Sequence, residues 1–80
     1  MMDNISRNFT LHYPISTIKE PLLYGLIMDF GLVPNVHRAR VSAQDGGEID
    51  VELSGAPESV ERGIRWLQDQ GLTVESLSDA

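Results

Sequence analysis

The sequence predicts an α+β domain in which two helices cover one face of a four-stranded antiparallel sheet. Two segments carry apolar residues at helical spacing, and four others alternate apolar with polar residues or are rich in β-branched residues. The six segments follow the order strand, helix, strand, strand, helix, strand. The chain has 80 residues, 41% of them hydrophobic and 22% charged, which is typical of one small domain. We expect a single domain over residues 1–80, with an ordered core at about 5–78.

The first strand is predicted over residues 7–13, where apolar residues alternate with polar ones: Phe9, Leu11 and Tyr13. The first helix is predicted over residues 21–31. Pro21 suits the first helical position, and Gly31 suits the C-terminal cap. The apolar residues of this helix recur at helical spacing: Leu23, Leu26, Ile27 and Phe30.

The next two strands are predicted over residues 34–43 and 48–54, with a turn signal between them: Asp45-Gly46-Gly47. Their less polar positions are all odd-numbered: Ala39, Val41, Ile49, Val51 and Leu53. Residues that face each other on antiparallel strands point to the same side, so their numbers must add to an even sum. This requires a loop of three or five residues, and it sets Arg40 opposite either Asp50 or Glu52.

The second helix is predicted over residues 57–70, with Pro57 in its first turn and Gly71 as its cap. Its apolar stripe consists of Val60, Gly63, Ile64 and Leu67. The last strand is predicted over residues 72–77. Right-handed crossovers place the strands in the order 4-1-3-2, which is the ferredoxin-like sandwich, and leave one sheet face uncovered.

Charge and composition exclude several classes of function. The chain has six Lys and Arg against twelve Asp and Glu and no cysteine. Its net charge of −6 repels phosphate backbones, so we expect no nucleic-acid partner. The lack of cysteine excludes disulfides, thiolate metal sites and a cysteine nucleophile. The longest apolar run, residues 21–28, is shorter than the ~20 residues of a membrane span, and no signal peptide is visible, so we expect a cytoplasmic protein without membrane insertion.

No catalytic or metal-binding arrangement is evident. The uncovered sheet face is expected to carry a mixture of polar and charged residues: Asn8, Thr10, His12, Arg38, Arg40, Asp50, Glu52, Thr73 and Glu75. The alternation places His12 on this face and His37 on the helix-covered face, so the two histidines cannot share a metal ion. No catalytic triad or carboxylate pair is recognisable, which indicates a protein that is not an enzyme and has no cofactor.

Two apolar residues of the first helix lie beside its core stripe. Tyr24 and Met28 are four residues apart, and they either cap the edge of the core or form a contact patch for a partner. Trp66 of the second helix either flanks the same layer or is exposed. His37 is expected to stack on its neighbours or to contact a ligand.

The order and spacing of several short segments resemble the NIL domain, a regulatory module of methionine-importer ATPase subunits that also occurs beside ferredoxin modules. The resemblance covers nearly the whole chain, in these segments: Leu11-His12-Tyr13-Pro14, Glu20-Pro21, Asp29-Phe30-Gly31, Asn35-Val36-His37, Gly46-Gly47, Trp66-Leu67 and Gln70-Gly71-Leu72. The family is named after an Asn-Ile-Leu tripeptide, for which this chain has Asn35-Val36-His37. Histidine therefore replaces the family leucine.

The resemblance implies a ferredoxin-like, ACT-like domain that pairs with a second copy and binds methionine near the pairing surface. It places Asn35 in the ligand site, with Val36 and His37 lining it. An asparagine side chain offers both a donor and an acceptor to the charged ends of an amino acid. The sequence has no phosphate-binding glycine loop, so it carries no ATPase of its own.

Two functions follow as hypotheses. The first is a non-catalytic regulatory module that senses methionine or another small amino acid as a homodimer. The alternative is a ligand-free interaction module that docks on a partner, such as a transporter or an iron–sulfur protein, through Tyr24, Met28 and the edge of the second strand. Any iron–sulfur cluster would belong to the partner, because this chain lacks cysteine.

Overall fold

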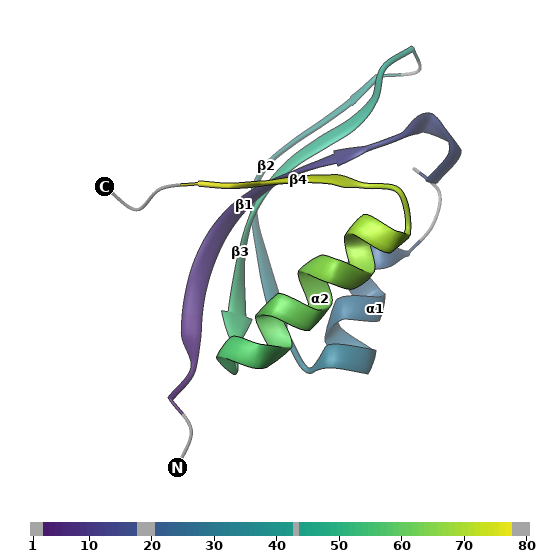
Figure 1. Ribbon diagram of the computed structural model, residues 1–80. Coiled ribbons are helices and arrows are strands. Elements are labelled where there is room, and N and C mark those ends of the chain that lie inside the picture. Colours follow the sequence, from purple (N-terminus) through teal and green to yellow (C-terminus); the bar gives the residue numbers. More distant parts are fainter. Residues whose placement is uncertain (1–2, 18–20, 43, 78–80) are drawn as a thin grey trace.

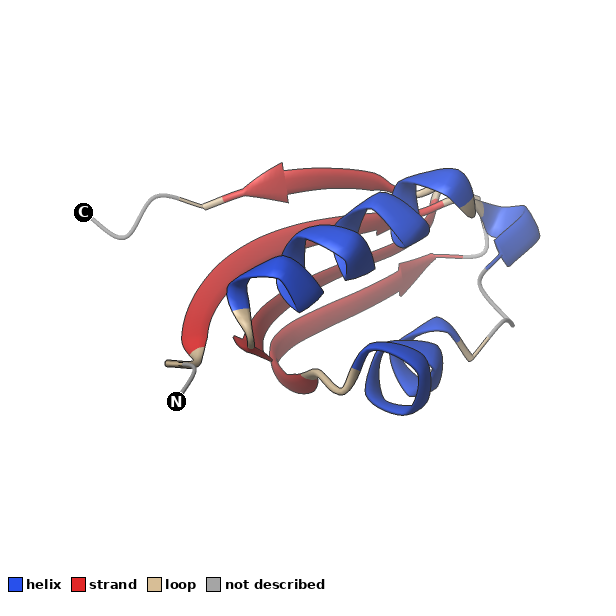
Figure 2. Ribbon diagram, turned by 60° about the horizontal axis from the view of Figure 1, so that its bottom comes forward, coloured by secondary structure: helices blue, strands red, loops and turns tan. Residues whose placement is uncertain are grey.

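A computed structural model describes residues 3–17, 21–42 and 44–77 of the protein. It contains one four-stranded antiparallel sheet in the order β2-β3-β1-β4, with both helices on one face (Figures 1 and 2), which confirms the predicted ferredoxin-like α+β fold. The elements are β1 (Ile5–Tyr13), η1 (Ile15–Thr17), α1 (Leu22–Phe30), β2 (Val33–Ser42), β3 (Gly46–Gly55), α2 (Pro57–Asp69) and β4 (Thr73–Ser76). The short 3-10 helix η1 is an addition to the predicted order.

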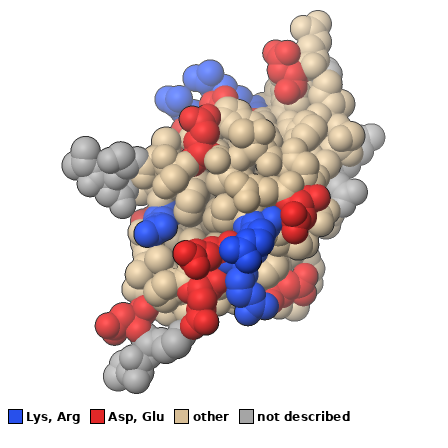
Figure 3. Space-filling view, in the orientation of Figure 1, with Lys and Arg blue, Asp and Glu red and all other residues tan. Residues whose placement is uncertain are grey.

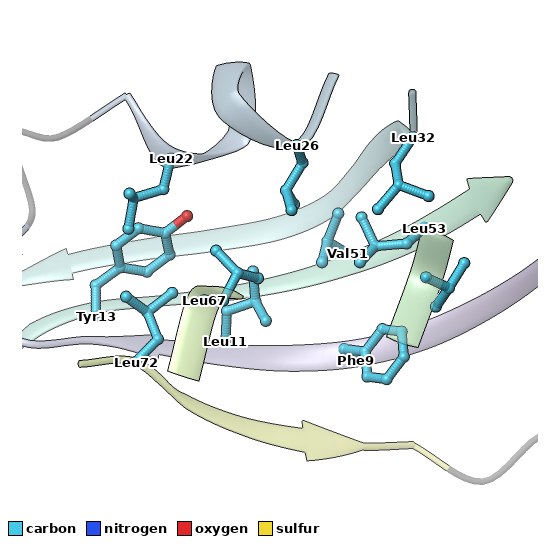
Figure 4. Close-up of a cluster of buried hydrophobic side chains, with 11 residues drawn as sticks. Phe9, Leu11, Tyr13, Leu22, Leu26, Leu32, Val51, Leu53, Leu67 and Leu72 are labelled. Carbon is cyan, nitrogen blue, oxygen red and sulfur yellow. The ribbon is translucent and has the colours of Figure 1, made fainter. Parts of the chain in front are cut away.

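The hydrophobic core lies between the sheet and the two helices. Figure 4 shows leucines of α1 and α2 pointing toward the apolar residues of the central strands. The buried members are Phe9, Leu11, Tyr13, Leu22, Leu26, Leu32, Val51, Leu53, Val60, Leu67 and Leu72. Burial of these side chains is the main favourable contribution to folding, at roughly 25 cal/mol per Å² of apolar surface.

The helices begin and end close to the predicted positions. Pro21 is the residue before the first turn of α1, and Gly31 caps the helix in a left-handed conformation, with φ of 66°. Its N–H donates to the Ile27 carbonyl at 3.2 Å. The predicted core position of Ile27 is wrong, because this side chain is 46% exposed, whereas Leu22 is buried. Because Leu22 and Leu26 face the sheet, the apolar stripe of α1 is rotated from the predicted one.

A β-bulge changes which residues of β2 face the helices. Val36 is opposite Val51, but the next pair is Arg38 with Asp50, so His37 is an extra residue without a Cα partner. The bulge shifts the alternation, so that even-numbered residues before it and odd-numbered residues after it lie on the helix side. The predicted uniform alternation of this strand is therefore wrong, and so is the placement of His37 on the helix-covered face.

The β2–β3 hairpin has a different register from the predicted one: the partner of Arg40 is two residues along β3 from the nearer of the two predicted partners. Ser42 pairs with Gly46, so three residues connect the strands, one of the two predicted loop lengths. Arg40 consequently lies opposite Glu48, and the prediction of Asp50 or Glu52 is wrong. Gly46 has φ of 91°, and a Cβ there would come 2.1 Å from the Tyr13 carbonyl oxygen. Only glycine fits this position, which sets where β3 begins.

Candidate ligand and partner sites

The open face of the sheet carries three rows of polar residues, each crossing β1, β3 and β2. Because paired residues of neighbouring strands point to the same face, each row is a set of adjacent side chains. The rows are Asn8–Glu52–Asn35, Thr10–Asp50–Arg38 and His12–Glu48–Arg40. This face is polar and mixed in charge, as the sequence predicts.

The first row meets the β-bulge of β2 and forms the bulge cluster, which consists of Asn35, His37 and Glu52. Asn35 is directly opposite Glu52, and His37 Nε2 lies 3.9 Å from Glu52 Oε1. All three are at least partly exposed. Val36 lies on the other side of the sheet, opposite Val51, and is 45% exposed. The structure therefore brings Asn35 and His37 together and separates Val36 from them.

Glu52 is the member of the bulge cluster that sequence reasoning missed as a site residue. A pattern in the sequence could have pointed to Glu52: among the apolar residues of β2, Val36 is even-numbered, whereas Ala39 and Val41 are odd-numbered. A strand cannot place all of them on one face unless it contains an extra residue. That reasoning predicts a bulge between Val36 and Ala39, and the bulge brings His37 toward Glu52.

The bulge cluster combines three groups that can bind both ends of an amino acid. The Glu52 carboxylate can accept hydrogen bonds from an ammonium group, and the Asn35 amide can donate to a carboxylate. The His37 ring adds a second donor or acceptor. The cluster lies on an exposed strand edge, so a ligand held there is covered only when another molecule packs against the same edge.

His12 lies in the third row and joins three strands. Its Nε2 donates to Glu75 Oε1 at 2.6 Å, and its Nδ1 lies 3.6 Å from Glu48 Oε1. His12 and His37 therefore share a face, contrary to the prediction, but their partners Glu48 and Glu52 are four residues apart, about 13 Å along the strand. Among the described residues, no group of three His, Cys, Asp or Glu side chains is placed to hold a metal ion.

Two hollows lie at the hairpin end of the sheet, away from the bulge cluster. The larger, of about 630 Å³, is on the side of His12, Arg40 and Glu48. The smaller, of about 260 Å³, is a groove between the start of α1 and the β2–β3 edge, and it is mostly apolar. Its lining includes Leu23, Tyr24, Val41 and Ile49. Burial in this region raises the pKa of Tyr13, whose side chain contributes to both hollows.

Exposed apolar side chains are concentrated on α1 and β2. Eight large hydrophobic side chains are exposed among the described residues. Three of them lie on α1 (Tyr24, Ile27 and Met28) and three on β2 (Val33, Val36 and Val41). Tyr24 and Met28 are 60% and 61% exposed, so they do not cap the core and remain available for contact. Trp66 is half-buried and packs beside Phe30, with ring centroids 5.6 Å apart.

A protein-family model described as the NIL domain matches residues 7–76. The chain belongs to the NIL domain family. This match confirms the resemblance seen in the sequence, and it extends from within β1 to the end of β4. No curated protein matches the chain.

Among solved structures, the chain is similar to the C-terminal domain of an ABC transporter ATP-binding protein from Enterococcus faecalis. The TM-score is 0.80 and the sequence identity is 13%, with 92% of this chain and 86% of the other covered. At this identity the similarity establishes the fold. Within the described residues, neither helix is long and apolar enough to cross a membrane.

Proposed function

We propose that this NIL domain is a non-catalytic, cytoplasmic regulatory module that binds a small amino acid and acts as a homodimer. The observation that carries the proposal is the bulge cluster, in which Asn35 and His37 lie beside Glu52 on an open strand edge. NIL family membership supports Asn35 as a ligand residue, through the tripeptide that Asn35 begins. Methionine is the first ligand to test.

Calorimetric titration of the chain with methionine, and then with the other amino acids, tests the ligand. We expect saturable heat with at least one of them. Asn35→Ala and Glu52→Gln should abolish it, because they remove the groups that face the carboxylate and the ammonium. Gln68→Ala, which removes an exposed amide from α2, is the matched control. If no amino acid gives heat, the sensing proposal is wrong.

The homodimer is proposed to form through the exposed edge of β2, beside the bulge cluster. None of the ten residues of β2 is buried, and a free strand edge can pair with the same edge of a second copy. Sedimentation of the chain should show a dimer at high micromolar concentration, and Val36→Glu should weaken it, because it adds a carboxylate to each copy at that edge, whereas Met28→Glu on α1 should not. A wild-type chain that stays monomeric at that concentration would rule out this part of the proposal.

A second candidate function is docking on another protein, such as a transporter subunit or an iron–sulfur protein. It is favoured by the exposed apolar side chains on both α1 and β2, of which Tyr24 and Val41 line the same groove. A pull-down that compares wild-type chain with Tyr24→Glu and Met28→Glu tests it. A specific partner should be lost with these variants and kept with Gln68→Ala. An unchanged set of captured proteins would exclude this surface as the contact.

A further inference from the structure

The charged side chains of β2 are all basic, although the domain as a whole is acidic. The strand carries His37, Arg38 and Arg40 but no carboxylate, in a chain whose net charge is −6. On the face that Figure 3 displays, acidic and basic side chains are interspersed, so charge is not segregated there as it is along this strand. After the bulge, the two arginines lie on the open face of the sheet, so this edge concentrates positive charge on that face.

The two arginines are not neutralised within their own sheet. Arg38 lies opposite Asp50, but Asp50 Oδ1 accepts a hydrogen bond from the Thr10 hydroxyl at 2.7 Å. Arg40 lies opposite Glu48, whose Oε1 is 3.6 Å from a ring nitrogen of the histidine in β1. Among the described residues, neither guanidinium group has a carboxylate oxygen within 4.0 Å. Both guanidinium groups therefore keep donors for a group from outside the chain.

The part of this edge that is regular enough to pair with a second copy is residues 38–42. The bulge at His37 interrupts the strand before it, and Pro34 has no N–H to donate to a neighbouring strand. On the helix side, this stretch carries Ala39 and Val41, of which Val41 is 73% exposed, so a second copy would gain apolar contact there. A homodimer through β2 therefore has its seam, the line along which the two strands pair, at the arginines.

Two-fold antiparallel pairing of this stretch brings arginines of the two copies together. With the axis at Arg38, Ala39 or Arg40, an arginine lies directly opposite an arginine of the other copy, with Cβ atoms about 5 Å apart. With the axis at Val41, the two Arg40 side chains are diagonal neighbours at about 7–8 Å, still within reach of long side chains. Like charges so close are destabilising, so each of these registers leaves a place for a negative group on the open face of the seam.

We propose that the seam between two copies of β2 binds a small multivalent oxyanion, phosphate or a polycarboxylate, between the arginines of the two copies. A guanidinium group donates two parallel hydrogen bonds to such an anion. Asp50 and Glu48 cannot take its place, because they lie on the β3 side of the arginines, away from the seam. The site is complete only in the dimer, so anion binding and dimerisation strengthen each other. This inference rests on the homodimer of the proposed function and names its regulation.

The test is sedimentation equilibrium of the full chain in chloride, phosphate and citrate buffers of equal pH and ionic strength. We expect phosphate or citrate to lower the dissociation constant of the dimer at least about tenfold relative to chloride, because a multivalent oxyanion bridges guanidinium groups of both copies and chloride does not. A gain with phosphate alone indicates a phosphoryl ligand, and a gain with citrate alone indicates a carboxylate ligand.

Variants assign the anion effect to the seam. Arg38→Gln combined with Arg40→Gln removes both the repulsion and the donors, so it should strengthen the dimer in chloride and remove the tenfold gain. Arg62→Gln combined with Arg65→Gln makes the same change in net charge on exposed positions of α2 and should keep the gain. Phosphate and citrate also strengthen apolar burial in general, and any gain left in the β2 double variant measures that contribution. Circular dichroism confirms that both double variants fold.

Three results would overturn the inference: a wild-type dimer with the same dissociation constant in all three buffers, an equal gain in the β2 double variant, or loss of the gain in the α2 control. The last would show that net charge, and not the seam, is the cause. Failure of the homodimer reads differently. A dimer without anion dependence removes the anion site alone, whereas a chain that stays monomeric in all three buffers removes the homodimer together with the site.

Discussion

Gly25 of α1 lies directly against the indole ring of Trp66 in α2. A Cβ built at Gly25 would come 2.6 Å from Trp66 Cη2 and 3.2 Å from Cζ3, well inside van der Waals contact. The same ring contacts Phe30 one turn and a half further along α1, at a centroid distance of 5.6 Å. A glycine in the interior of a nine-residue helix is thus explained by the approach of the second helix.

Gly25→Ala is expected to destabilise the domain. Alanine gains about 1 kcal/mol of intrinsic helix propensity over glycine, but overpacking a fitted contact costs about 1–3 kcal/mol, so the net loss should be about 1 kcal/mol. Thermal and urea unfolding followed by circular dichroism measure it. In a Trp66→Leu background the same substitution should become neutral or stabilising, and an unchanged loss in that background would show that the ring is not the cause.

Truncation of the core should cost far more than truncation of the exposed strand. Leu53 is fully buried in the central strand β3, so Leu53→Ala should lower the free energy of unfolding by about 2–5 kcal/mol. Val41→Ala on the exposed edge of β2 should change it by less than about 0.5 kcal/mol. Urea denaturation measures the loss of free energy of unfolding in each variant, and the two values can be compared if both variants unfold with the same m-value. Comparable losses would contradict the described placement of Val41.

Deletion of His37 should leave the fold intact. Val36 pairs with Val51 and Arg38 with Asp50, so the deletion joins two segments that are already in register and changes the free energy of unfolding by about 1 kcal/mol or less. Deletion of Ala39 is the control, because it would turn the residues on one side of it to the opposite face. If the two deletions are equally harmful, β2 does not contain the bulge.

Titration of Tyr13 should weaken the fold at high pH. Burial raises the pKa of its phenol above the ordinary value of 10.0, so the unfolded chain loses this proton first as the pH rises. The stabilisation is fully present below pH 10 and is lost above it, at up to about 1.4 kcal/mol per pH unit until the folded phenol ionises. Urea unfolding at several pH values between 8 and 11 measures this loss of stability. Tyr13→Phe should remove the part of the loss that is due to the Tyr13 phenol. An equal alkaline loss in Tyr13→Phe would contradict the prediction.

The order of elements and most of the core were predictable, because they depend on local periodicity. Alternation identified Phe9, Leu11 and Tyr13, and helical spacing identified Val60, Gly63 and Leu67. The placements of Ile27, Arg40 and His37 were not predicted correctly. Rotation of a helix about its axis and the register of a hairpin depend on contacts between elements, which a single element does not encode.

The candidate site shows the same division. Asn35 and His37 were recognised from the tripeptide, whereas Glu52 became part of the site only through the bulge that sets it beside them. Tyr24 and Met28 were recognised as surplus apolar surface, but their exposure was decided by the way α1 packs on the sheet.

The sequence by itself determined the α+β class, through periodicities of about two and 3.6 residues, and the lack of thiol chemistry, through its composition. The strand order followed from the handedness of the crossovers, and the NIL family from the order and spacing of its short segments. Only the tertiary structure decided which side of β2 each residue faces. One extra residue in a strand reverses the side of every residue beyond it, and its cost or benefit depends on the neighbouring strand. The basic and apolar faces of the β2 edge, and the grouping of Asn35, His37 and Glu52, follow from that single residue.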